Sequence, residues 1–530
     1  MALTIDDVME KIGSMSRYQY RLLLICGYGQ LFAAAFQVMI PTFLSVEPPW
    51  RCKDNSSACN LTGTFKPGDP NYKFRCSISR DDWEFDTSEL NSVVTEWDLV
   101  CDVSALSMLT KAVMFLGFLI GVLAGGFLSD KFGRKPIAYF LTVLCNILAL
   151  AGSFIHVYWL YVLVRVLVGV CIGGSNLAMY VLLVEYVGKR HRHVIGTTLF
   201  YFWVLALLLL SLFAYLIRDW RTLSIAGAVP GLLQIFFWWF FPESPRWLLA
   251  HGKPKEAIEE LKKAAAFNRK EMPAGELEQK DATSAQRQGD FRDLFSSIAM
   301  TKRTLISWFT WMVISLVYYA VSFSAGTFGG NRYLVFFLTS LIELPSNWTC
   351  IKLCRKIGRK KTTVLGVIVA FFASVIAVFF QRDLHNTGFM VANIIMAQGI
   401  AKFFINMSFS SIYVYSSELF PTVIRNIGMG TSSAMARIGS MFAPYIVWLV
   451  RVHMLLPYSI VAVLAFVCAG LCFLLPETKD APTLENMDSV NNNNNNNNST
   501  ELMENGNLPL EPSKEKEEMG ELLLNQCYPA

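Results

Sequence analysis

The chain has 530 residues, of which 53% are hydrophobic and 16% are charged. Soluble domains carry about 25% charged residues, so this composition excludes a soluble enzyme of several domains. The formal net charge of +5 is modest, and no run of Lys and Arg interleaved with aromatic residues indicates a nucleic-acid partner. A lipid bilayer is the solvent that accepts this much apolar surface, so a membrane protein is expected.

The N-terminal segment 1–20 is polar, and the apolar run that follows it has no small-residue cleavage site. No cleavable signal peptide is therefore expected, and the first apolar run is kept as a membrane helix.

Twelve apolar runs are long enough to cross a bilayer core, which takes about 20 helical residues. Six of them predict an N-terminal bundle over 21–241, with helices near 21–44, 105–129, 137–156, 159–186, 194–216 and 222–241. Six more predict a C-terminal bundle over 304–475, with helices near 304–325, 332–352, 362–381, 388–415, 427–450 and 455–475. A charged middle loop, 242–303, separates the bundles, and the polar tail 476–530 is predicted to be disordered.

Three short loops rich in Lys and Arg set the expected orientation: 130–136, 187–193 and 353–361. All three lie on one side if the helices alternate, and the positive-inside rule makes that side cytoplasmic. Both termini and the middle loop share this side. We therefore expect a multi-pass protein of the plasma membrane with the long loop 46–104 outside the cell.

The 46–104 loop has the features of an extracellular segment. Two glycosylation sequons begin at Asn55 and Asn60. Four cysteines in the same loop predict two disulfides in an oxidising compartment, with three possible pairings: Cys52, Cys59, Cys76 and Cys101.

Three short patterns recur at nearly constant spacing. The tripeptide at 133–135 (Gly-Arg-Lys) returns at 358–360, and Pro-Glu-Ser at 242–244 returns as Pro-Glu-Thr at 476–478. A Glu with an Arg seven residues later occurs twice, at Glu185 and at Glu418. The pattern indicates a duplicated six-helix unit. Transporters built from such repeats bind substrate between the bundles, near the middle of the membrane.

Four ionisable residues fall inside predicted helices, where charge is costly: Arg165, Glu343, Lys402 and Arg437. One interpretation is that they pair with one another and hold helices together. The other is that they line a substrate cavity, which we favour for Lys402 and Arg437. Glu343 precedes Pro345, so it is expected at a bend, as a proton or cation site or as a partner of Lys402.

A second set of charges lies at cytoplasmic helix ends and predicts gate salt bridges that form in one state and part in another. Its members are Asp130, Arg134, Glu185, Arg192, Glu418 and Arg425.

Aromatic residues inside the bundle are candidate contacts for an organic cation. Trp311 and Tyr318 are seven residues apart and share a helical face. Aromatic faces attract ammonium groups, although most aromatic residues in such a chain are expected to be core or lipid-facing. No nucleotide-binding loop or His/Cys metal spacing occurs, so neither an enzyme nor a cofactor is expected. Sodium coupling stays open.

Several motifs together narrow the family. The segment 126–136 reads GFLSDKFGRKP, and it resembles the signature of the major facilitator superfamily. The stretches 94–101 (VTEWDLVC), 242–248 (PESPRWL), 343–345 (ELP) and 418–426 (ELFPTVIRN) are similar to solute carrier family 22, which carries organic cations, carnitine and organic anions. The resemblance covers about residues 7–485.

The resemblance implies an all-α polytopic membrane protein with the major facilitator superfamily fold, twelve transmembrane helices in two six-helix pseudo-repeats. It implies a central site lined by Trp311, Tyr318, Glu343 and Ser410. Arg437 stands where the best-known cation carriers have an acid, and Asn176 stands where they have an aromatic residue. Both departures favour a carboxylate-bearing substrate, since guanidinium binds carboxylate bidentately.

These observations predict a carrier of carnitine-like zwitterions or organic cations that works by alternating access. Arg437 would hold the carboxylate, Trp311 and Tyr318 would face the ammonium group, and Glu343 and Lys402 would balance charge. One rival is an organic anion exchanger that uses Arg437 and Lys402. A rival of another class is a membrane receptor, scaffold or channel that transports nothing by alternating access.

Overall fold

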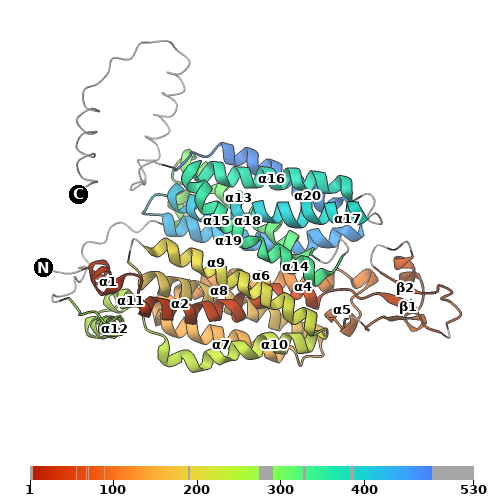
Figure 1. The fold of residues 1–530 in the computed structure, drawn as a ribbon, viewed down its shortest axis with the longest axis horizontal. Coiled ribbons are helices and arrows are strands. Elements are labelled where there is room, and N and C mark those ends of the chain that lie inside the picture. The colour runs from red at the N-terminus through yellow and green to blue at the C-terminus, as the bar shows by residue number, and fades with distance from the viewer. Residues whose placement is uncertain are drawn as a thin grey trace, which may run out of the picture.

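A computed structural model describes residues 4–479. It omits 55, 67, 68, 70, 89, 189, 190, 274–289, 326–329 and 382–386, and it gives only the backbone of 192–194, 196 and 197. In the described residues, twelve helical segments are long and apolar enough to cross a membrane. They form two bundles that lie side by side, with loops at both ends (Figure 1).

The first bundle, here the N half, runs from Arg17 to Phe240. Its first span is built from α2 (Arg17–Gly29), the π-helical η1 (Gln30–Phe36), α3 (Gln37–Met39) and α4 (Pro41–Leu44). The other five are α6 (Leu106–Phe132), α7 (Arg134–Gly152), α8 (Tyr158–Glu185), α9 (Arg192–Leu216), and α10 (Trp220–Leu232) continued by η6 (Leu233–Phe240).

The second bundle, here the C half, runs from Ile298 to Phe473. It contains α13 (Ile298–Phe323), α14 (Arg332–Leu341) with α15 (Glu343–Lys356), α16 (Arg359–Phe380), α17 (Thr387–Asn393) with the π-helical η9 (Ile394–Ile400) and α18 (Ala401–Leu419), α19 (Arg425–Trp448) with η10 (Leu449–Arg451), and α20 (Leu456–Phe473).

Two bundle boundaries lie earlier than the apolar runs predict. The N half begins at Arg17 rather than 21, and the C half begins at Ile298 rather than 304. Helix caps explain both differences. Ser16 and Gln19 form a capping box at the start of α2, and the Ser297 side chain accepts from the backbone N–H of Met300. Capping satisfies the free N–H groups of the first turn, so these helices extend beyond the apolar core.

The segments predicted as an N-terminal tail and a middle loop contain packed helices. They are α1 (Ile5–Gly13), α11 (Pro245–Ala250), α12 (Pro254–Phe267) and the short η8 (Phe291–Phe295). Asn268, just after α12, joins the backbones of two other segments: it accepts from Tyr18 N–H at 2.8 Å and donates to the Ile12 carbonyl at 3.0 Å. Val8 and Leu261 are both fully buried in one apolar cluster with this region. The prediction of a plain loop over 242–303 is therefore corrected. The tail beyond 479 lies outside the described residues.

The 46–104 segment forms a small domain at the opposite end of the molecule, here the cap domain (Figure 1). Its three strands pair antiparallel in the order β2 (Thr64–Phe65), β1 (Trp50–Cys52), β3 (Trp83–Phe85). Short helices complete it: η2 (Tyr72–Ser77), η3 (Arg80–Asp82), α5 (Val93–Glu96) and η4 (Cys101–Val103).

Two disulfides close the cap domain, Cys52–Cys59 and Cys76–Cys101. The buried Trp50 and Trp83 pack edge to face, with 5.9 Å between ring centroids. So small a domain needs such covalent links, because its core alone buries little apolar area. Asn60 is exposed, as an acceptor of glycan must be, and Asn55 lies outside the described residues.

Helices α6 and α8 approach each other at backbone contact. A Cβ placed on Gly117 or Gly121 would collide with carbonyl groups of α8, and one on Gly169 or Gly173 would collide with carbonyl groups of α6. Small residues at such an interface gain dispersion energy that lipid cannot replace. The N half is therefore a tightly packed unit around this helix pair.

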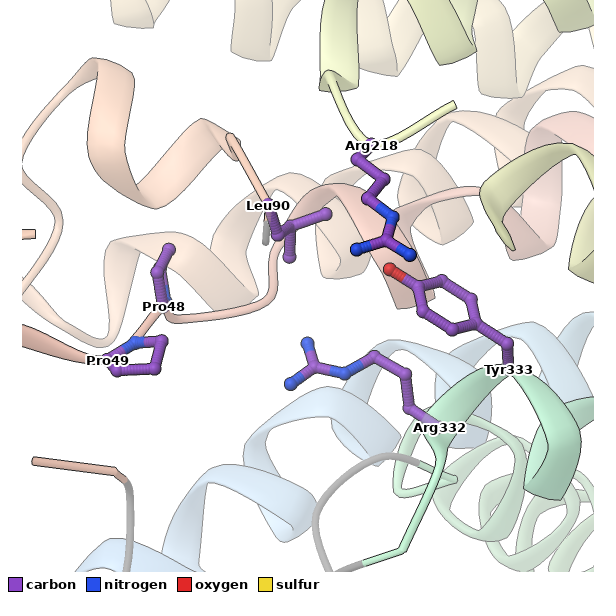
Figure 2. Close-up of a pocket in the computed structure, with 6 residues that line it drawn as sticks. All are labelled: Pro48, Pro49, Leu90, Arg218, Arg332 and Tyr333. Atoms are coloured by element: carbon purple, nitrogen blue, oxygen red, sulfur yellow. The ribbon is translucent and has the colours of Figure 1, made fainter. Parts of the chain in front are cut away.

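The two halves meet at the cap end around a cavity of about 40 Å³ (Figure 2). Arg218 of the N half points into it, and so do Arg332 and Tyr333 at the start of α14. The Tyr333 ring stacks on Phe43 of α4 with 5.6 Å between centroids. Because this cavity is small and peripheral, the two halves are in contact here through aromatic packing and are not parted by a wide opening.

At the opposite end, here the basic end, the repeated motifs come together in pairs. The Glu243 carboxylate accepts from the backbone N–H groups of Arg134 (2.8 Å) and Lys135 (3.3 Å) at the start of α7. Gly133 precedes them with φ of 105°, and a Cβ there would collide with the carboxylate. A half-buried carboxylate thus caps the positive end of α7.

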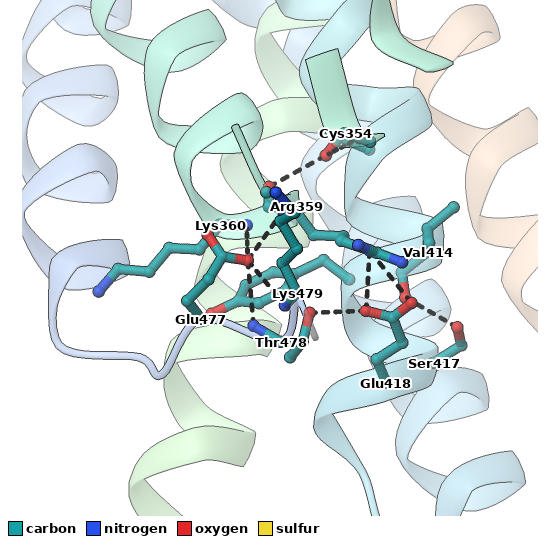
Figure 3. A network of polar contacts seen from close by, with 12 residues as sticks. Cys354, Arg359, Lys360, Val414, Ser417, Glu418, Glu477, Thr478 and Lys479 are labelled. Carbon is teal, nitrogen blue, oxygen red and sulfur yellow. Dashed lines mark hydrogen bonds and ion pairs between the residues drawn. The ribbon is translucent and has the colours of Figure 1, made fainter. Parts of the chain in front are cut away.

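The C half repeats this arrangement with Glu477 and α16 (Figure 3). Glu477 accepts from Arg359 N–H at 2.8 Å and Lys360 N–H at 3.2 Å, after Gly358 with φ of 104°. Burial acts to raise the pKa of Glu477, but backbone N–H donors, including those of Thr478 and Lys479, prevail and hold it below the usual value. At Glu243 burial prevails and raises the pKa.

Glu477→Gln is expected to lower the free energy of unfolding at pH 7.5 by about 2 kcal/mol, because hydrogen bonds to a charged acceptor become neutral ones. The lowered pKa means that this stabilisation exists above the unfolded-state pKa and is lost as the pH falls through the folded-state pKa. Thermal unfolding of the purified protein between pH 7.5 and pH 4 measures both effects. Glu256→Gln, at an exposed position of α12, is the control, and a mutant defect that is unchanged at pH 4 would contradict the assignment.

Candidate functional site

A buried ion pair lies between α15 and α18 inside the C half. The Lys402 Nζ is 3.0 Å from Glu343 Oε1, and their side chains are 3% and 2% exposed. Lys402 also donates to the Ser322 hydroxyl, and its ammonium group lies 3.5 Å from the ring centroid of Tyr318. The Tyr318 hydroxyl donates to the same carboxylate oxygen at 2.9 Å.

Local breaks in helical geometry place both charges. Glu343 opens α15 after the chain leaves α14 at Leu341, two residues before Pro345. Lys402 follows the π-helical segment η9. Proline removes a helical hydrogen bond and π turns widen a helix, and both features are frequent at functional sites. The helix is thus interrupted at Ile342, directly before Glu343, and Lys402 is the partner of Glu343.

The ion pair continues as a line of polar side chains between the same two helices. Asn347 Oδ1 accepts from Ser410 Oγ at 2.6 Å and from Asn406 Nδ2 at 3.1 Å. Ser410 thus lies two turns along α18 from Lys402. Sequence reasoning did not include Asn347 and Asn406, although polar residues four apart in apolar helices were the available signal.

Aromatic rings cover this polar line. Trp311 and Tyr318 of α13 both contact Phe409, with centroid distances of 6.4 Å and 5.4 Å. Tyr413 packs on Trp311 at 4.5 Å. From the N half, Trp203 Nε1 donates to the Tyr318 hydroxyl at 3.0 Å. The aromatic cluster therefore lies where α9 of one half meets α13 of the other.

Arg437 of α19 reaches across the same boundary. Its guanidinium carbon lies 4.1 Å from the ring centroid of Phe118 in α6. The side chain is half-buried, and its Nε has no hydrogen-bond partner among the described residues. Arg437 is thus a membrane cation with no carboxylate partner in that part of the chain.

Lys111 of α6 is a second such cation, and sequence reasoning did not include it. It is 4% exposed, its Nζ lies 5.4 Å from the ring centroid of Phe323 in α13, and within the described ranges it has no ion pair. It sits in the first two turns of α6, where a Lys is easily taken for a solvated helix end.

Two other predicted residues lie apart from the cluster. Arg165 of α8 donates to the Gln37 carbonyl at 3.0 Å and contacts Met114 Sδ at 2.9 Å, so it ties α8 to two neighbouring helices. Asn176, also on α8, is half-buried, and in the described structure no hydrogen bond or ring contact joins it to the aromatic cluster.

The predicted gate charges form pairs within each half, not between halves. Arg134 lies 2.5 Å from Asp130 and 3.5 Å from Glu185. In the C half, Glu418 pairs with Arg359 at 3.1 Å and accepts from the Thr478 hydroxyl at 2.6 Å (Figure 3).

Arg425 does not pair with Glu418 in this structure, because its guanidinium turns back to the Thr422 hydroxyl at 3.2 Å and the Phe420 carbonyl at 3.4 Å. A separation of seven residues suits one helix face, but α18 ends at Leu419 and the chain turns before Arg425. The side chain of Arg192 lies outside the described part of the chain.

Charged contacts between the halves are found at the cap end instead. Glu47, 7% exposed, pairs with Arg75 of the cap domain and with Arg451 at the end of the C half's η10. Next to it, Trp448 Nε1 donates to Ser104 Oγ at 3.4 Å. These contacts, here the cap latch, hold the cap end of the two halves together.

Lys402→Met alone is expected to destabilise the protein by about 3–5 kcal/mol, because the Glu343 carboxylate is left buried without its partner. The double variant Lys402→Met/Glu343→Gln is expected to recover most of this loss. Melting temperatures of the wild type, Lys402→Met, Glu343→Gln and the double variant in detergent give the coupling energy between the two side chains. Additive effects of the two single substitutions would contradict a direct pair.

Arg451→Gln is expected to weaken the cap latch, because the partner of Glu47 from the other half becomes neutral. In a Ser104→Cys background, a membrane-impermeant maleimide should then label position 104 several times faster. Arg51→Gln, which removes an exposed cap-domain pair with Glu84, is the matched control. Equal labelling rates in both variants would rule out a latch role.

Comparison with known proteins agrees with this architecture. The family described as sugar (and other) transporter matches residues 23–490. The organic cation transporter protein of Drosophila melanogaster is 32% identical, over 94% of this chain and 97% of its own length. Human solute carrier family 22 member 13 is 31% identical over 89% and 90%, and human organic cation/carnitine transporter 2 is 32% identical over 77% and 74%.

Solved structures of a bacterial sugar symporter share the fold. The proton:xylose symporter XylE bound to 6-bromo-6-deoxy-D-glucose aligns with a TM-score of 0.59 and 19% identity, covering 89% of this chain and 99% of that one. The inward open conformation of the E. coli protein aligns with a TM-score of 0.60 and 16% identity. The chain therefore belongs to solute carrier family 22 of the major facilitator superfamily, and it is a multi-pass membrane transporter of two six-helix bundles, not an enzyme.

Proposed function

We propose that this transporter carries carnitine-like zwitterions, and more weakly organic cations, across the plasma membrane, with both termini in the cytoplasm. The observation that carries the proposal is the buried Glu343–Lys402 pair under Tyr318, together with Arg437 at the boundary between the halves, which has no carboxylate partner in the described chain. The names of the relatives that carry organic cations and carnitine support the same class of substrate.

Charge balance favours a zwitterion. A plain cation that binds Glu343 must displace Lys402 and leave its ammonium group unpaired inside the membrane. Removing one partner of a buried ion pair costs about 3–5 kcal/mol. A zwitterion avoids this cost, because its ammonium group replaces Lys402 at Glu343 while its carboxylate accepts a freed cation.

Two features of the site suit the two ends of such a substrate. Lys402 already occupies an ammonium position over the Tyr318 ring, 3.5 Å from its centroid, and a substrate ammonium would take this position. Arg437 offers a guanidinium with an unbonded Nε to the carboxylate. The site's net positive charge also supports the rival, an organic anion exchanger. In an anion exchanger, however, Glu343 would have no role.

Alternating access follows from where the halves touch. The cap latch and the Tyr333–Phe43 stack join the halves at the cap end. The described ion pairs at the basic end lie inside one half each. Rocking of the rigid halves would then open the basic end first. When the cap latch parts, the cap end would open and the basic end would close. Positive loops at the basic end support its placement in the cytoplasm.

Uptake of labelled carnitine by cells that express the chain is expected to saturate and to increase when unlabelled carnitine is preloaded. Arg437→Ala should reduce carnitine kcat/KM by about 10-fold or more, since one charged hydrogen bond contributes about 1.5–3 kcal/mol. Arg437→Lys should keep part of the activity because it retains the charge.

Uptake in sodium and in potassium medium should be equal, since the exchange of one zwitterion for another moves no net charge and needs no inorganic ion.

Three controls are needed to interpret these uptake measurements. Surface labelling must show normal expression of each variant. A labelled dicarboxylate or aryl anion taken up in place of carnitine would favour the anion exchanger. Intact carnitine uptake by Arg437→Ala would refute its role as the carboxylate partner, and the lack of any saturable, preload-stimulated uptake would favour a receptor or scaffold.

A further inference from the structure

Lys111 is the least expected charge in the molecule. It lies on α6, within the span Cys101–Phe132, and only 4% of the residue is exposed. The structure gives it a ring contact with Phe323 and, in the described residues, no carboxylate. Two other buried cations of the described spans have named polar partners: Lys402 pairs with Glu343, and Arg165 donates to a backbone carbonyl.

An ammonium group in this position needs a compensating interaction, because burial of an unpaired charge costs several kcal/mol. A contact with one phenyl ring returns only about 0.5–2 kcal/mol. The ring therefore does not compensate for burial by itself. An anionic partner that comes from outside the chain would compensate for the burial of the charge.

Lys111 and Arg437 have matching positions on the boundary between the halves. Lys111 belongs to the N half and lies on Phe323 of the C half, whereas Arg437 belongs to the C half and lies on Phe118 of the N half. When the halves rock apart, each cation leaves its ring and faces the opening between them.

Aromatic rings connect the two cations. Phe115 of α6 contacts Tyr319 at 4.7 Å and Phe323 at 6.2 Å between centroids. Lys111, Phe115 and Phe118 share one face of α6, at intervals of four and three residues. Lys111 and Phe118 are seven residues apart, which is about 10 Å along the helix. The two cations therefore contact rings at different depths along α6.

The direction of α6 orders the two cations along the transport path. Leu106 begins the helix next to Ser104, which is part of the cap latch, so Lys111 lies nearer the cap end and Arg437 deeper. In the present state, Trp448 of the C half holds Ser104, seven residues before Lys111. Opening of the latch would expose Lys111 before Arg437.

We propose that Lys111 is an outer carboxylate-binding site, which receives the carboxylate of the substrate when the cap end opens and passes it to Arg437. The proposal rests on the proposed function, since it assumes a substrate that bears a carboxylate. It assigns to Lys111 the selection of carboxylate-bearing substrates over cations of the same size.

The first experiment does not depend on transport. Thermal unfolding of the purified full chain is measured with butyrate and with butyramide, which has the same size and no charge. A ligand that binds the folded state raises the melting temperature. Butyrate is expected to stabilise an Arg437→Ala variant, in which Lys111 is the remaining carboxylate site, more than butyramide does, and the addition of Lys111→Met should remove this difference. Lys352→Met, which removes an exposed Lys that lies over Trp348, is the matched control and should keep it.

The second experiment compares uptake of 4-trimethylammoniobutyrate with uptake of butyltrimethylammonium, which lacks the carboxylate. Lys111→Met is expected to raise the KM of the zwitterion about tenfold or more, the loss of one charged hydrogen bond. The KM of the plain cation should stay within about twofold, and Lys111→Arg should behave like the wild type because it keeps the charge.

The two experiments separate failure of this proposal from failure of the proposed function. An equal loss for both substrates, or no change for either, would show that Lys111 only packs against Phe323, and the proposal would be overturned. Butyrate stabilisation of the Arg437→Ala variant that survives the addition of Lys111→Met would overturn it as well. A wild type that carries neither substrate, together with butyrate stabilisation of Arg437→Ala that Lys111→Met removes, would refute the proposed function while supporting a carboxylate site at Lys111.

Discussion

A charge inside a bilayer needs a partner, and the arrangement of this transporter depends on how it meets that requirement. Glu343 and Lys402 satisfy each other, with Tyr318 and Ser322 completing their hydrogen bonds. Breaking this pair without replacement costs more than most single contacts in the protein contribute. The pair can open only for a ligand that supplies both signs of charge or for a change in the surrounding helices. Binding is thereby linked to movement.

The same requirement separates rigid parts from moving ones. Within each half, carboxylates cap helices and bind arginines at the basic end, as Glu243 does for α7 and Glu477 does for α16. Glycines let α6 and α8 touch along their backbones. Between the halves the contacts include aromatic stacks, cation–ring contacts, the Trp203–Tyr318 hydrogen bond and the cap latch, and these can part without leaving a helix end uncapped. Motion therefore takes place between the halves, while each half keeps its own hydrogen bonds.

The boundary between the halves carries a surplus of positive charge. Arg437 and Lys111 each lie on a phenyl ring of the opposite half, and neither has a carboxylate partner in the described chain. An aromatic contact is a weak substitute for a carboxylate, so both positions favour an anionic group brought by a ligand. The Glu343 carboxylate under Tyr318 supplies the opposite preference nearby. Together they describe a substrate with separated charges of both signs.

Much of the architecture was determined by the sequence, because the lipid solvent leaves few alternatives. A run of apolar residues of the right length has to be a helix, so twelve spans and their division into two halves were predictable. The recurrence of Gly-Arg-Lys and Pro-Glu-Ser/Thr showed the duplication, and the four cysteines of the cap domain indicated two disulfides. Glu343, Lys402 and Arg437 were recognisable as candidate site residues because charge is rare inside such runs.

Tertiary structure decided which residues meet, because contacts between helices depend on rotation and tilt that no local pattern records. It paired Cys52 with Cys59, joined Lys402 to Glu343, and gave Glu418 to Arg359 instead of Arg425. It also brought Glu47 to Arg451 across some four hundred residues, and it showed that Lys111 is buried between the halves, not at a solvated helix end. Composition and periodicity report which face of a helix avoids water or lipid, whereas the partner on that face is set by the packing of the whole bundle.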